Sequence, residues 1–230
     1  GAGSGIGRSL AVQLSRDGAH LALGDINLEN LSKTEELLMK ATRMSSHRVD
    51  VADRESMGTF ASEVIAEHDR VDILINNAGI TLTPTVFEDI SEPDFMKVID
   101  VNMLGVYYGI REFLPHLQSR PEAVIVNMSS LAGLVGLYGY SPYAMSKFAI
   151  RGLTESLQSE LAGTNVSLLI VHPGGVKTNI IKNAPNLDDE QQREAAHGEF
   201  TRFALINPDT AARKILSAIK KNKRQLVFGI

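Results

Sequence analysis

The chain of 230 residues contains no cysteine, and its formal net charge is only -4. The lack of cysteine excludes disulfides, thiolate metal sites and a cysteine nucleophile. The small net charge gives no electrostatic attraction to nucleic acid, so we expect no nucleic-acid partner. No apolar run approaches the roughly 18 residues that a membrane span needs, and no leader of charged and then apolar residues is visible. These absences favour a cytoplasmic protein without membrane contact.

What the chain does contain is an alternation of short apolar runs with longer segments of helical period. The runs that predict strands are His20 to Gly24, Val71 to Ile75, Ala123 to Asn127, Val166 to Val171 and Gln225 to Phe228. The segments that predict helices are Leu28 to Ala41, Arg54 to His68, Glu92 to Leu117, Pro142 to Leu161 and Asp209 to Lys221. Alternation at these lengths predicts right-handed β-α-β crossovers and an α/β fold, whose parallel sheet is covered on both faces.

One long connection, Thr178 to Pro208, interrupts this alternation and is rich in acids, amides and alanine. Structureless connections of this length are uncommon in compact domains and often cover a site. We expect this segment to carry a short helix and to act as a lid. No Pro/Gly/Ser-rich linker divides the chain, so residues 1–230 are predicted to form one domain with a lid at about 178–208.

A glycine-rich turn, Gly1 to Gly7, runs directly into a segment of helical period. Glycines let the backbone approach a pyrophosphate, and the amides at a helix start attract its charge. Asp25 follows the next predicted strand, at the distance where an acid binds the adenosine ribose hydroxyls of NAD and repels the 2′-phosphate of NADP. A flexible loop and a helix-capping acid are the alternatives. Because neither Ser4 nor Ile26 supplies a cation, NAD is favoured over NADP.

A phosphate-binding turn of this kind follows a strand that anchors it to the sheet. The sequence shows no strand before Gly1. We therefore expect roughly ten residues to precede Gly1 and to supply the first strand.

Tyr143 and Lys147 lie four residues apart at the start of a predicted helix, which places both side chains on one face. A lysine beside a tyrosine favours the phenolate, so the pair predicts a lowered tyrosine pKa. The tyrosine would then serve as an acid or base near neutral pH.

Several motifs surround this pair in order along the chain. They are Gly1-x-x-x-Gly5-Ile6-Gly7, Asn76-Asn77-Ala78-Gly79, Asn102, Ser130 and Pro173-Gly174-Gly175-Val176-Lys177-Thr178. With Tyr143 and Lys147 they closely resemble the short-chain dehydrogenase/reductase family over essentially the whole chain. The resemblance implies a three-layer, doubly wound Rossmann fold and an NAD(P)-dependent oxidoreductase. The threonine expected before Gly1 is missing, and the end at Ile230 comes early for the family.

The resemblance implies a role for each of four residues. Tyr143 would be the acid/base that gives a proton to a ketone oxygen or takes one from an alcohol. Lys147 would lower the tyrosine pKa and hold the nicotinamide ribose. Ser130 would position the substrate oxygen, and Asn102 would interrupt its helix and hold a water that links Lys147 to solvent.

The remaining implied residues are cofactor contacts. The full set expected at the dinucleotide is Gly1, Ser4, Gly5, Ile6, Asp25, Asp50, Val51, Asn76, Ala78, Gly79, Tyr143, Lys147, Pro173, Gly174, Val176 and Thr178. Asp50 would bind the adenine amino group, although a capping role is its alternative. Asn76 is expected to be mainly structural and to border the cofactor through backbone. Thr178 would bind the carboxamide or the pyrophosphate.

The histidines are scattered without ligand spacing, so no metal is expected in the chemistry. Apolar residues between Ser130 and Tyr143 predict a wall beside the reacting oxygen, and the lid would add further apolar side chains. The wall is Leu131, Leu134, Val135, Leu137, Tyr138 and Tyr140, and the lid residues are Ile180, Ile181, Phe200 and Phe203. This pattern favours a mostly apolar secondary alcohol or ketone as the small-molecule substrate.

Three functions are compatible with these residues. The first is an NAD-dependent oxidoreductase, and the second is an NADPH-dependent carbonyl or 3-oxoacyl reductase. The third, of a different class, is a dinucleotide-binding sensor or scaffold without turnover. By resemblance, helices 102–117 and 143–161 are expected to pair between subunits of a homodimer or homotetramer.

Overall fold

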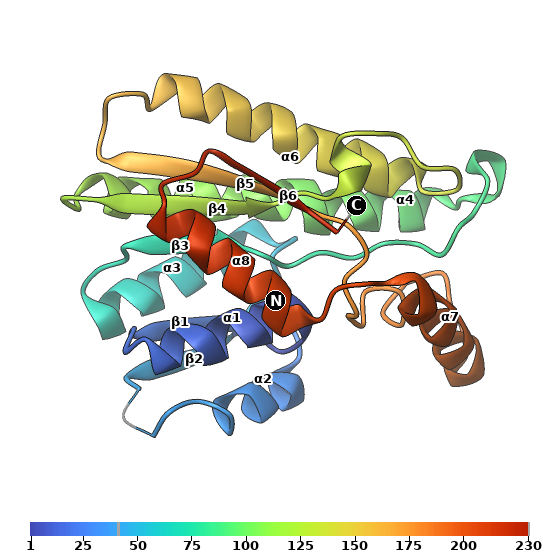
Figure 1. Ribbon diagram of the computed structural model, residues 1–230, viewed down its shortest axis with the longest axis horizontal. Coiled ribbons are helices and arrows are strands. Elements are labelled where there is room, and N and C mark those ends of the chain that lie inside the picture. Colours follow the sequence, from blue (N-terminus) through green and yellow to red (C-terminus); the bar gives the residue numbers. More distant parts are fainter. Residues whose placement is uncertain (41, 230) are drawn as a thin grey trace.

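Figure 1 shows the computed structural model of the chain, which describes residues 1–40 and 42–229. The strands are β1 (Leu21–Asp25), β2 (Met44–Arg48), β3 (Ile73–Asn76), β4 (Ala123–Met128), β5 (Val166–Pro173) and β6 (Gln225–Phe228). The α-helices are α1 (Gly5–Arg16), α2 (Leu28–Glu35), α3 (Arg54–His68), α4 (Glu92–Ile99), α5 (Gly105–Gln118), α6 (Ser141–Glu160), α7 (Glu190–Phe203) and α8 (Pro208–Lys220). A π-helical segment, η2 (Asp100–Leu104), joins α4 to α5, and the 3₁₀ turns are η1 (Phe87–Asp89) and η3 (Leu131–Gly133).

The strands are parallel, as the alternation of strands and helices predicts. β1 pairs with β2, and β3, β4, β5 and β6 pair in that order in a second sheet. In a parallel sheet the carboxyl ends of the strands meet at one edge, where ligands of α/β proteins bind. At this edge Asp25 is the last residue of β1, and Ser130 and Gly174 come shortly after β4 and β5.

Both faces of the sheet are covered, which explains the nearly continuous apolar strands. Along β4, Val126 and Met128 join a core with residues of α1 and α8, whereas Ala123 and Ile125 join a core with residues of α3, α5 and α6. Figure 1 shows α1 and α8 on one side of the sheet, in blue and red. The predicted three-layer arrangement is therefore confirmed. In the part of the chain that the structure describes, no helix has the length and hydropathy to cross a bilayer.

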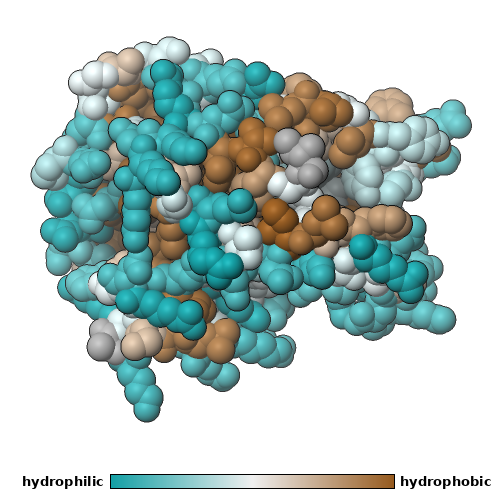
Figure 2. Space-filling view, in the orientation of Figure 1, coloured by the Kyte–Doolittle hydropathy of each residue, from teal (hydrophilic) through white to brown (hydrophobic). Residues whose placement is uncertain are grey.

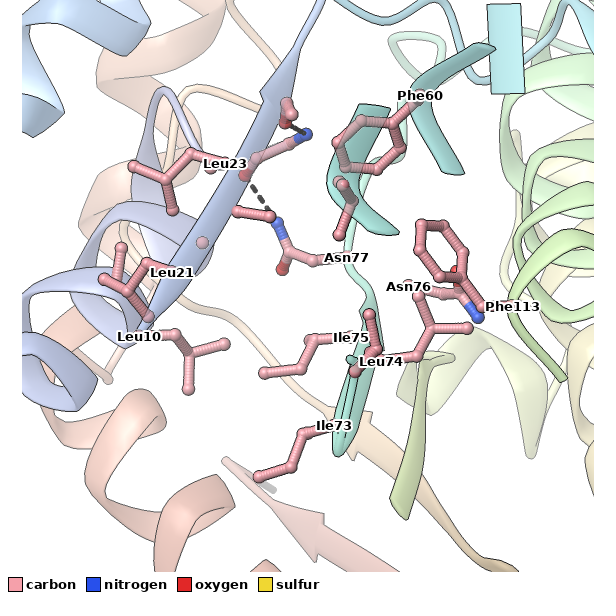
Figure 3. A pocket seen from close by; sticks show the side chains of 18 of the residues that line it. Leu10, Leu21, Leu23, Phe60, Ile73, Leu74, Ile75, Asn76, Asn77 and Phe113 are labelled. Carbon is pink, nitrogen blue, oxygen red and sulfur yellow. Dashed lines mark hydrogen bonds between the residues drawn. The ribbon is translucent and has the colours of Figure 1, made fainter. Parts of the chain in front are cut away.

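A cavity of about 480 Å³ separates the two sheets between β1 and β3 (Figure 3). We call it the inter-sheet slot. Its lining is largely apolar and includes Leu10, Leu21, Leu23, Phe60, Ile73, Leu74, Ile75 and Phe113. A strand lying here would pair with both sheets, because among the described residues the slot-facing edges of β1 and β3 have no ladder partner. The strand expected before Gly1 stays a prediction, and the slot is the place in the sheet that suits it.

Strand β2 was not predicted from the sequence, because its residues, Met44 to Arg48, are mostly polar. Ser45 and His47 are nevertheless buried and hydrogen-bond to each other through His47 Nε2 at 2.7 Å. Glu63 and His68 of α3 complete this chain at 2.8 Å each. Buried polar groups that satisfy one another lack the apolar pattern by which strands are recognised.

Two predicted helices differ from those observed. The helix predicted from Leu28 to Ala41 ends at Glu35, and Ala41 lies outside the described residues. It ends there because the chain turns, and Met39 N–H donates to Ser15 Oγ of α1 at 2.7 Å instead of to a helical carbonyl. The helix predicted from Glu92 to Leu117 is divided by the π-helical segment around Asn102.

Candidate functional site

The first turns of α6 bring Tyr143 and Lys147 beside the end of β4. Pro142, in the first turn, suits a helix start because its missing N–H needs no partner there. Lys147 is buried, its Nζ donates to the Met128 carbonyl at 3.0 Å, and it lies 5.5 Å from the centre of the Tyr143 ring. Ser130 lies two residues after the end of β4 and hydrogen-bonds to Tyr143. The structure therefore brings the three predicted residues together.

The prediction that Lys147 lowers the pKa of Tyr143 is wrong for this structure. Burial raises the pKa of Tyr143 above its usual value, and the hydrogen bond from Ser130 only partly opposes this. Burial also lowers the pKa of Lys147 to about 8. Both shifts favour the neutral forms, because a low-dielectric environment penalises charge. Spacing in the sequence shows that the two residues share a helical face, but not how deeply they are buried.

Asn102 is fully buried within the π-helical segment, as its predicted role of interrupting the helix requires. Its Nδ2 donates to the Ile80 carbonyl at 2.9 Å and to Ser146 Oγ at 3.0 Å, and its Oδ1 accepts from Ile80 N–H at 2.8 Å. Both side-chain donor hydrogens therefore have partners. A water beside Lys147 would have to use the backbone carbonyl of Asn102 rather than its side chain.

Glycine contacts shape the phosphate-binding turn. A Cβ at Gly7 would overlap the carbonyl oxygen of Gly1, and one at Gly1 would lie 2.8 Å from the backbone of Ala78. Gly5 adopts a φ of 51°, a conformation that glycine tolerates and other residues rarely adopt. Ser4, the N-cap of α1, makes no side-chain capping bond, so it leaves the first helical amides for another acceptor. The predicted residues Gly1, Ser4, Gly5 and Ile6 thus lie at one helix start.

Asn77, absent from the predicted contacts, connects this turn to the end of β3. Its Nδ2 donates to the Gly1 carbonyl at 2.8 Å, a bond drawn in Figure 3. Asn76 instead points to Asn127 of β4, at 2.8 Å. The motif that contains Asn76 and Asn77 was visible in the sequence, but the partner of each side chain was not.

Asp25 lies where the turn and β1 meet. Its two carboxylate oxygens accept from Gly3 N–H at 2.8 Å and from Asn27 N–H at 2.9 Å. Asp50 accepts from Ala52 N–H at 3.0 Å, and Asp53 is the N-cap of α3. Asp50 therefore supports its own turn and is not the helix cap.

The residues after β5 reach the same edge. Pro173 ends β5, Gly174 donates its N–H to the Phe228 carbonyl at 2.8 Å, and Val176 forms a parallel bridge with Ile206. A Cβ at Gly5 would lie 3.0 Å from Thr178 Cγ2. Thr178 is thus adjacent to the start of α1, although the two are far apart in the chain.

Two further predicted cofactor contacts are Gly79, which lies beside Lys147, and Val51. A Cβ at Gly79 would lie 3.4 Å from Lys147 Nζ and 3.2 Å from Asn102 Oδ1, so Gly79 borders both groups and a larger residue would crowd the Asn102 amide. Val51 packs against Gly105, whose added Cβ would lie 2.9 Å from it. Among the described residues, no group of three or more His, Asp or Glu could hold a metal ion.

Segment 178–208 carries α7. Asn186 attaches it to the body, because its side chain accepts from Thr83 N–H at 3.1 Å and donates to Thr83 Oγ1 at 2.8 Å. Within the segment, Arg193 donates to the carbonyl of Lys182 at 2.8 Å. Ile181 is buried, whereas Phe203 is 76% exposed, so the side chain of Phe203 does not face inward in this structure.

Comparisons with known proteins agree with this geometry. A family model described as short chain dehydrogenase matches residues 1–188. The protein named "Putative oxidoreductase SadH" of Mycobacterium tuberculosis is 42% identical over 100% of this chain and 84% of its own length. A 3-oxoacyl-(acyl-carrier-protein) reductase of Thermotoga maritima is 32% identical over 94% of this chain and 86% of its own length.

Two solved structures show the same fold. A short-chain dehydrogenase/reductase from Burkholderia phymatum in complex with NAD is 28% identical, with a TM-score of 0.89 over 99% of this chain and 86% of that one. An alcohol dehydrogenase from Thermococcus sibiricus complexed with 5-hydroxy-NADP is 26% identical, with a TM-score of 0.84 over 99% and 93%.

Proposed function

The chain belongs to the short-chain dehydrogenase family, and we propose that it transfers hydride between NAD and a secondary alcohol or ketone. It is an oxidoreductase that acts on CH–OH groups with a nicotinamide dinucleotide. The observation that carries the proposal is the grouping of Tyr143, Ser130 and buried Lys147 at the carboxyl edge of the sheet, beside a glycine-rich helix start.

In this proposal Tyr143 is the residue that donates the proton to the substrate oxygen or accepts it from that oxygen. For ketone reduction, the carbonyl carbon receives hydride and the carbonyl oxygen takes the proton of the Tyr143 hydroxyl; alcohol oxidation reverses both transfers. Ser130 hydrogen-bonds the same oxygen and holds it beside the phenol. The nicotinamide ring, when bound, supplies or accepts the hydride.

Lys147 and Asn102 would return the proton to solvent. Lys147 has a pKa of about 8, so its ammonium and amine forms are both accessible near neutral pH. The π-helical turn releases backbone groups at Asn102 from the regular helical pattern. We propose that a water on the Asn102 carbonyl connects Lys147 to solvent.

Several features support NAD as the cofactor. The free amides after Ser4, with Thr178 beside Gly5, suit a pyrophosphate. Asp25 would accept the ribose hydroxyls and repel a 2′-phosphate. Arg8 lies nearby, but its guanidinium already donates to Gly3, Asn30 and Thr34. Asp50, Val51, Asn76, Ala78, Gly79, Pro173, Gly174 and Val176 complete the proposed cofactor contacts.

One observation favours the second candidate, an NADPH-dependent carbonyl or 3-oxoacyl reductase. Arg48, at the end of β2, is the partner of Asp25 in the parallel register and is exposed. Parallel partners place their side chains on the same face. An arginine beside the ribose position could bind a 2′-phosphate and offset the repulsion from Asp25.

We propose a mostly apolar substrate. Tyr138 is 86% exposed, and Val135 and Leu137 of the same loop are 52% and 45% exposed. On the face shown in Figure 2, hydrophobic side chains gather near the end of β6, toward α7. Segment 178–208 would close over this region as a lid, within the single domain of residues 1–230.

We also propose a homodimer or homotetramer. Tyr107 of α5 and Met145 and Phe148 of α6 are 43%, 53% and 41% exposed. Burial of these apolar side chains between subunits would favour association through α5 and α6, the helices expected to pair.

Turnover of Tyr143→Phe tests the function. The variant should keep dinucleotide binding, followed by cofactor fluorescence, while its rate of alcohol oxidation falls by about 10³-fold, the range of general acid–base catalysis. A wild-type protein that binds the dinucleotide but turns over no member of an alcohol and ketone panel would instead support a sensor or scaffold.

A further inference from the structure

His172 is the last residue but one of β5. It is fully buried and is not among the residues proposed to be catalytic. Its Nδ1 lies 3.0 Å from the carbonyl oxygen of Ser130. The backbone around it is fixed, because β5 pairs with β4 up to Met128 and Val171, and His172 itself is in register with Val227 of β6. The ring is therefore held in place by strands on both sides.

The partner of Nδ1 determines the tautomer. A carbonyl oxygen only accepts hydrogen bonds, so Nδ1 must carry the hydrogen and donate it. Nε2 is buried, with no hydrogen-bond partner among the described residues. A second hydrogen there would be a buried donor without an acceptor, so the ring is neutral. Burial lowers the pKa of His172, although the hydrogen bond to the Ser130 carbonyl opposes this; the nearby charges of Arg151 and Glu155 act in opposite directions.

The Ser130 carbonyl lies beyond the last ladder pair between β4 and β5, so the sheet does not hold it. It accepts two hydrogen bonds, one from Gly133 N–H at 2.9 Å within its own turn and one from His172. Among the described contacts, the bond from His172 alone ties this carbonyl to the sheet. The same residue presents the Oγ that hydrogen-bonds Tyr143.

We infer that His172 is a positioning residue, whose Nδ1–H fixes the Ser130 peptide so that the serine hydroxyl meets Tyr143 and the substrate oxygen. The inference rests on the proposed function, since it assigns the role through Ser130. Small displacements of positioned groups cost up to about 100-fold in rate.

Two amide variants separate the role of Nδ1 from simple packing. The Nδ2 of asparagine occupies the place of histidine Nδ1, whereas the amide of glutamine reaches the place of Nε2. His172→Gln should lower kcat by about 10- to 100-fold with little change in the KM of the dinucleotide, and His172→Asn should recover most of that loss. His116→Asn, a histidine at the far end of α5, is the control for loss of a ring.

A double-mutant cycle with Ser130→Ala tests whether the effect passes through the serine. Once the hydroxyl is gone, His172→Gln should cost less than twofold more, because the two changes remove the same interaction. The inference would be overturned if the loss of kcat in the double variant equalled the product of the losses in the two single variants. It would also be overturned if His172→Gln had the same kcat as the wild type. An asparagine variant that folds, judged by its thermal midpoint, but is no faster than the glutamine variant would overturn it as well. A wild-type protein without any turnover would instead defeat the proposed function, and the inference with it.

Discussion

The dinucleotide side and the proton-handling side of the site are built differently. Around the glycine-rich turn, backbone meets backbone: Gly7 approaches Gly1, and Gly1 approaches Ala78. Around Tyr143, buried side chains hold distant backbone: Lys147 donates to Met128, and Ser129 donates to the Lys147 carbonyl at 2.9 Å. The first side depends mainly on glycines that leave room for close backbone contacts, with Asn77 and Asp25 bonded to that backbone, and the second depends on buried side chains. Substitutions should therefore separate dinucleotide affinity from turnover.

Gly7→Ala should have the largest effect and should act on affinity. Its new methyl group would overlap the Gly1 carbonyl and displace the turn, so we expect dinucleotide affinity to fall by about 1,000-fold, or about 4 kcal/mol. Fluorescence titration measures this. Gly58→Ala on α3 is the control, since its nearest neighbour would be the end of the Glu112 side chain at 3.9 Å. Equal affinities in the two variants would contradict the backbone-contact view.

Lys147 should make folding stability depend on pH. Its folded-state pKa of about 8 lies below its usual 10.5, so between these values the unfolded chain binds more protons and stability rises with pH. We expect a gain of up to about 3 kcal/mol across that window. Urea unfolding between pH 8 and 10 measures it, below the range where Tyr143 would act in the opposite direction. A Lys147→Met variant should lose this slope; an unchanged slope would assign it to other groups.

Gly133→Ala should act on turnover. A Cβ there would overlap Ser129 Oγ and lie 2.7 Å from the Lys147 carbonyl, which pushes the turn after Ser130 away from α6. We expect kcat to fall by about 100-fold with dinucleotide affinity within about threefold. Gly136→Ala, in the same loop, is the control because nothing lies within 4 Å of its Cβ position. A loss of affinity as large as the loss of kcat would erase the distinction between the two sides.

Asp25 and Arg48 should produce the smallest change, in cofactor choice. Asp25→Ser removes the repulsion of a 2′-phosphate, so the ratio of kcat/KM for NAD to that for NADP should fall by about 10-fold. Arg48→Ser should raise the same ratio if its guanidinium reaches the ribose. Wild-type preference for NADP would favour the second candidate function.

The sequence was most informative where chemistry depends on spacing within one element. Tyr143 and Lys147 were predicted from a single helical face, and the family resemblance added Ser130 and Asn102. The contacts of Asn77 and Gly133 were not predicted, because they join parts of the chain that are distant in the sequence. The direction of the Tyr143 pKa shift was missed for a related reason: charge spacing is local, whereas burial is a property of the whole fold.

Strand β2 shows the same limit for the fold itself. The apolar strands were recognised from composition, but the buried Ser45 and His47 find their partners in each other and in Glu63 and His68 of α3. From the sequence these polar residues are expected at the surface, whereas in the structure both are buried.

The open edges of the inter-sheet slot have a consequence for the geometry of the site. Among the described residues, the facing edges of β1 and β3 leave backbone N–H and C=O groups without a ladder partner. A strand paired with both edges would join β1 and β2, with Asp25, to the sheet that carries Ser130. The register of that one strand would then set how far the acid lies from the serine.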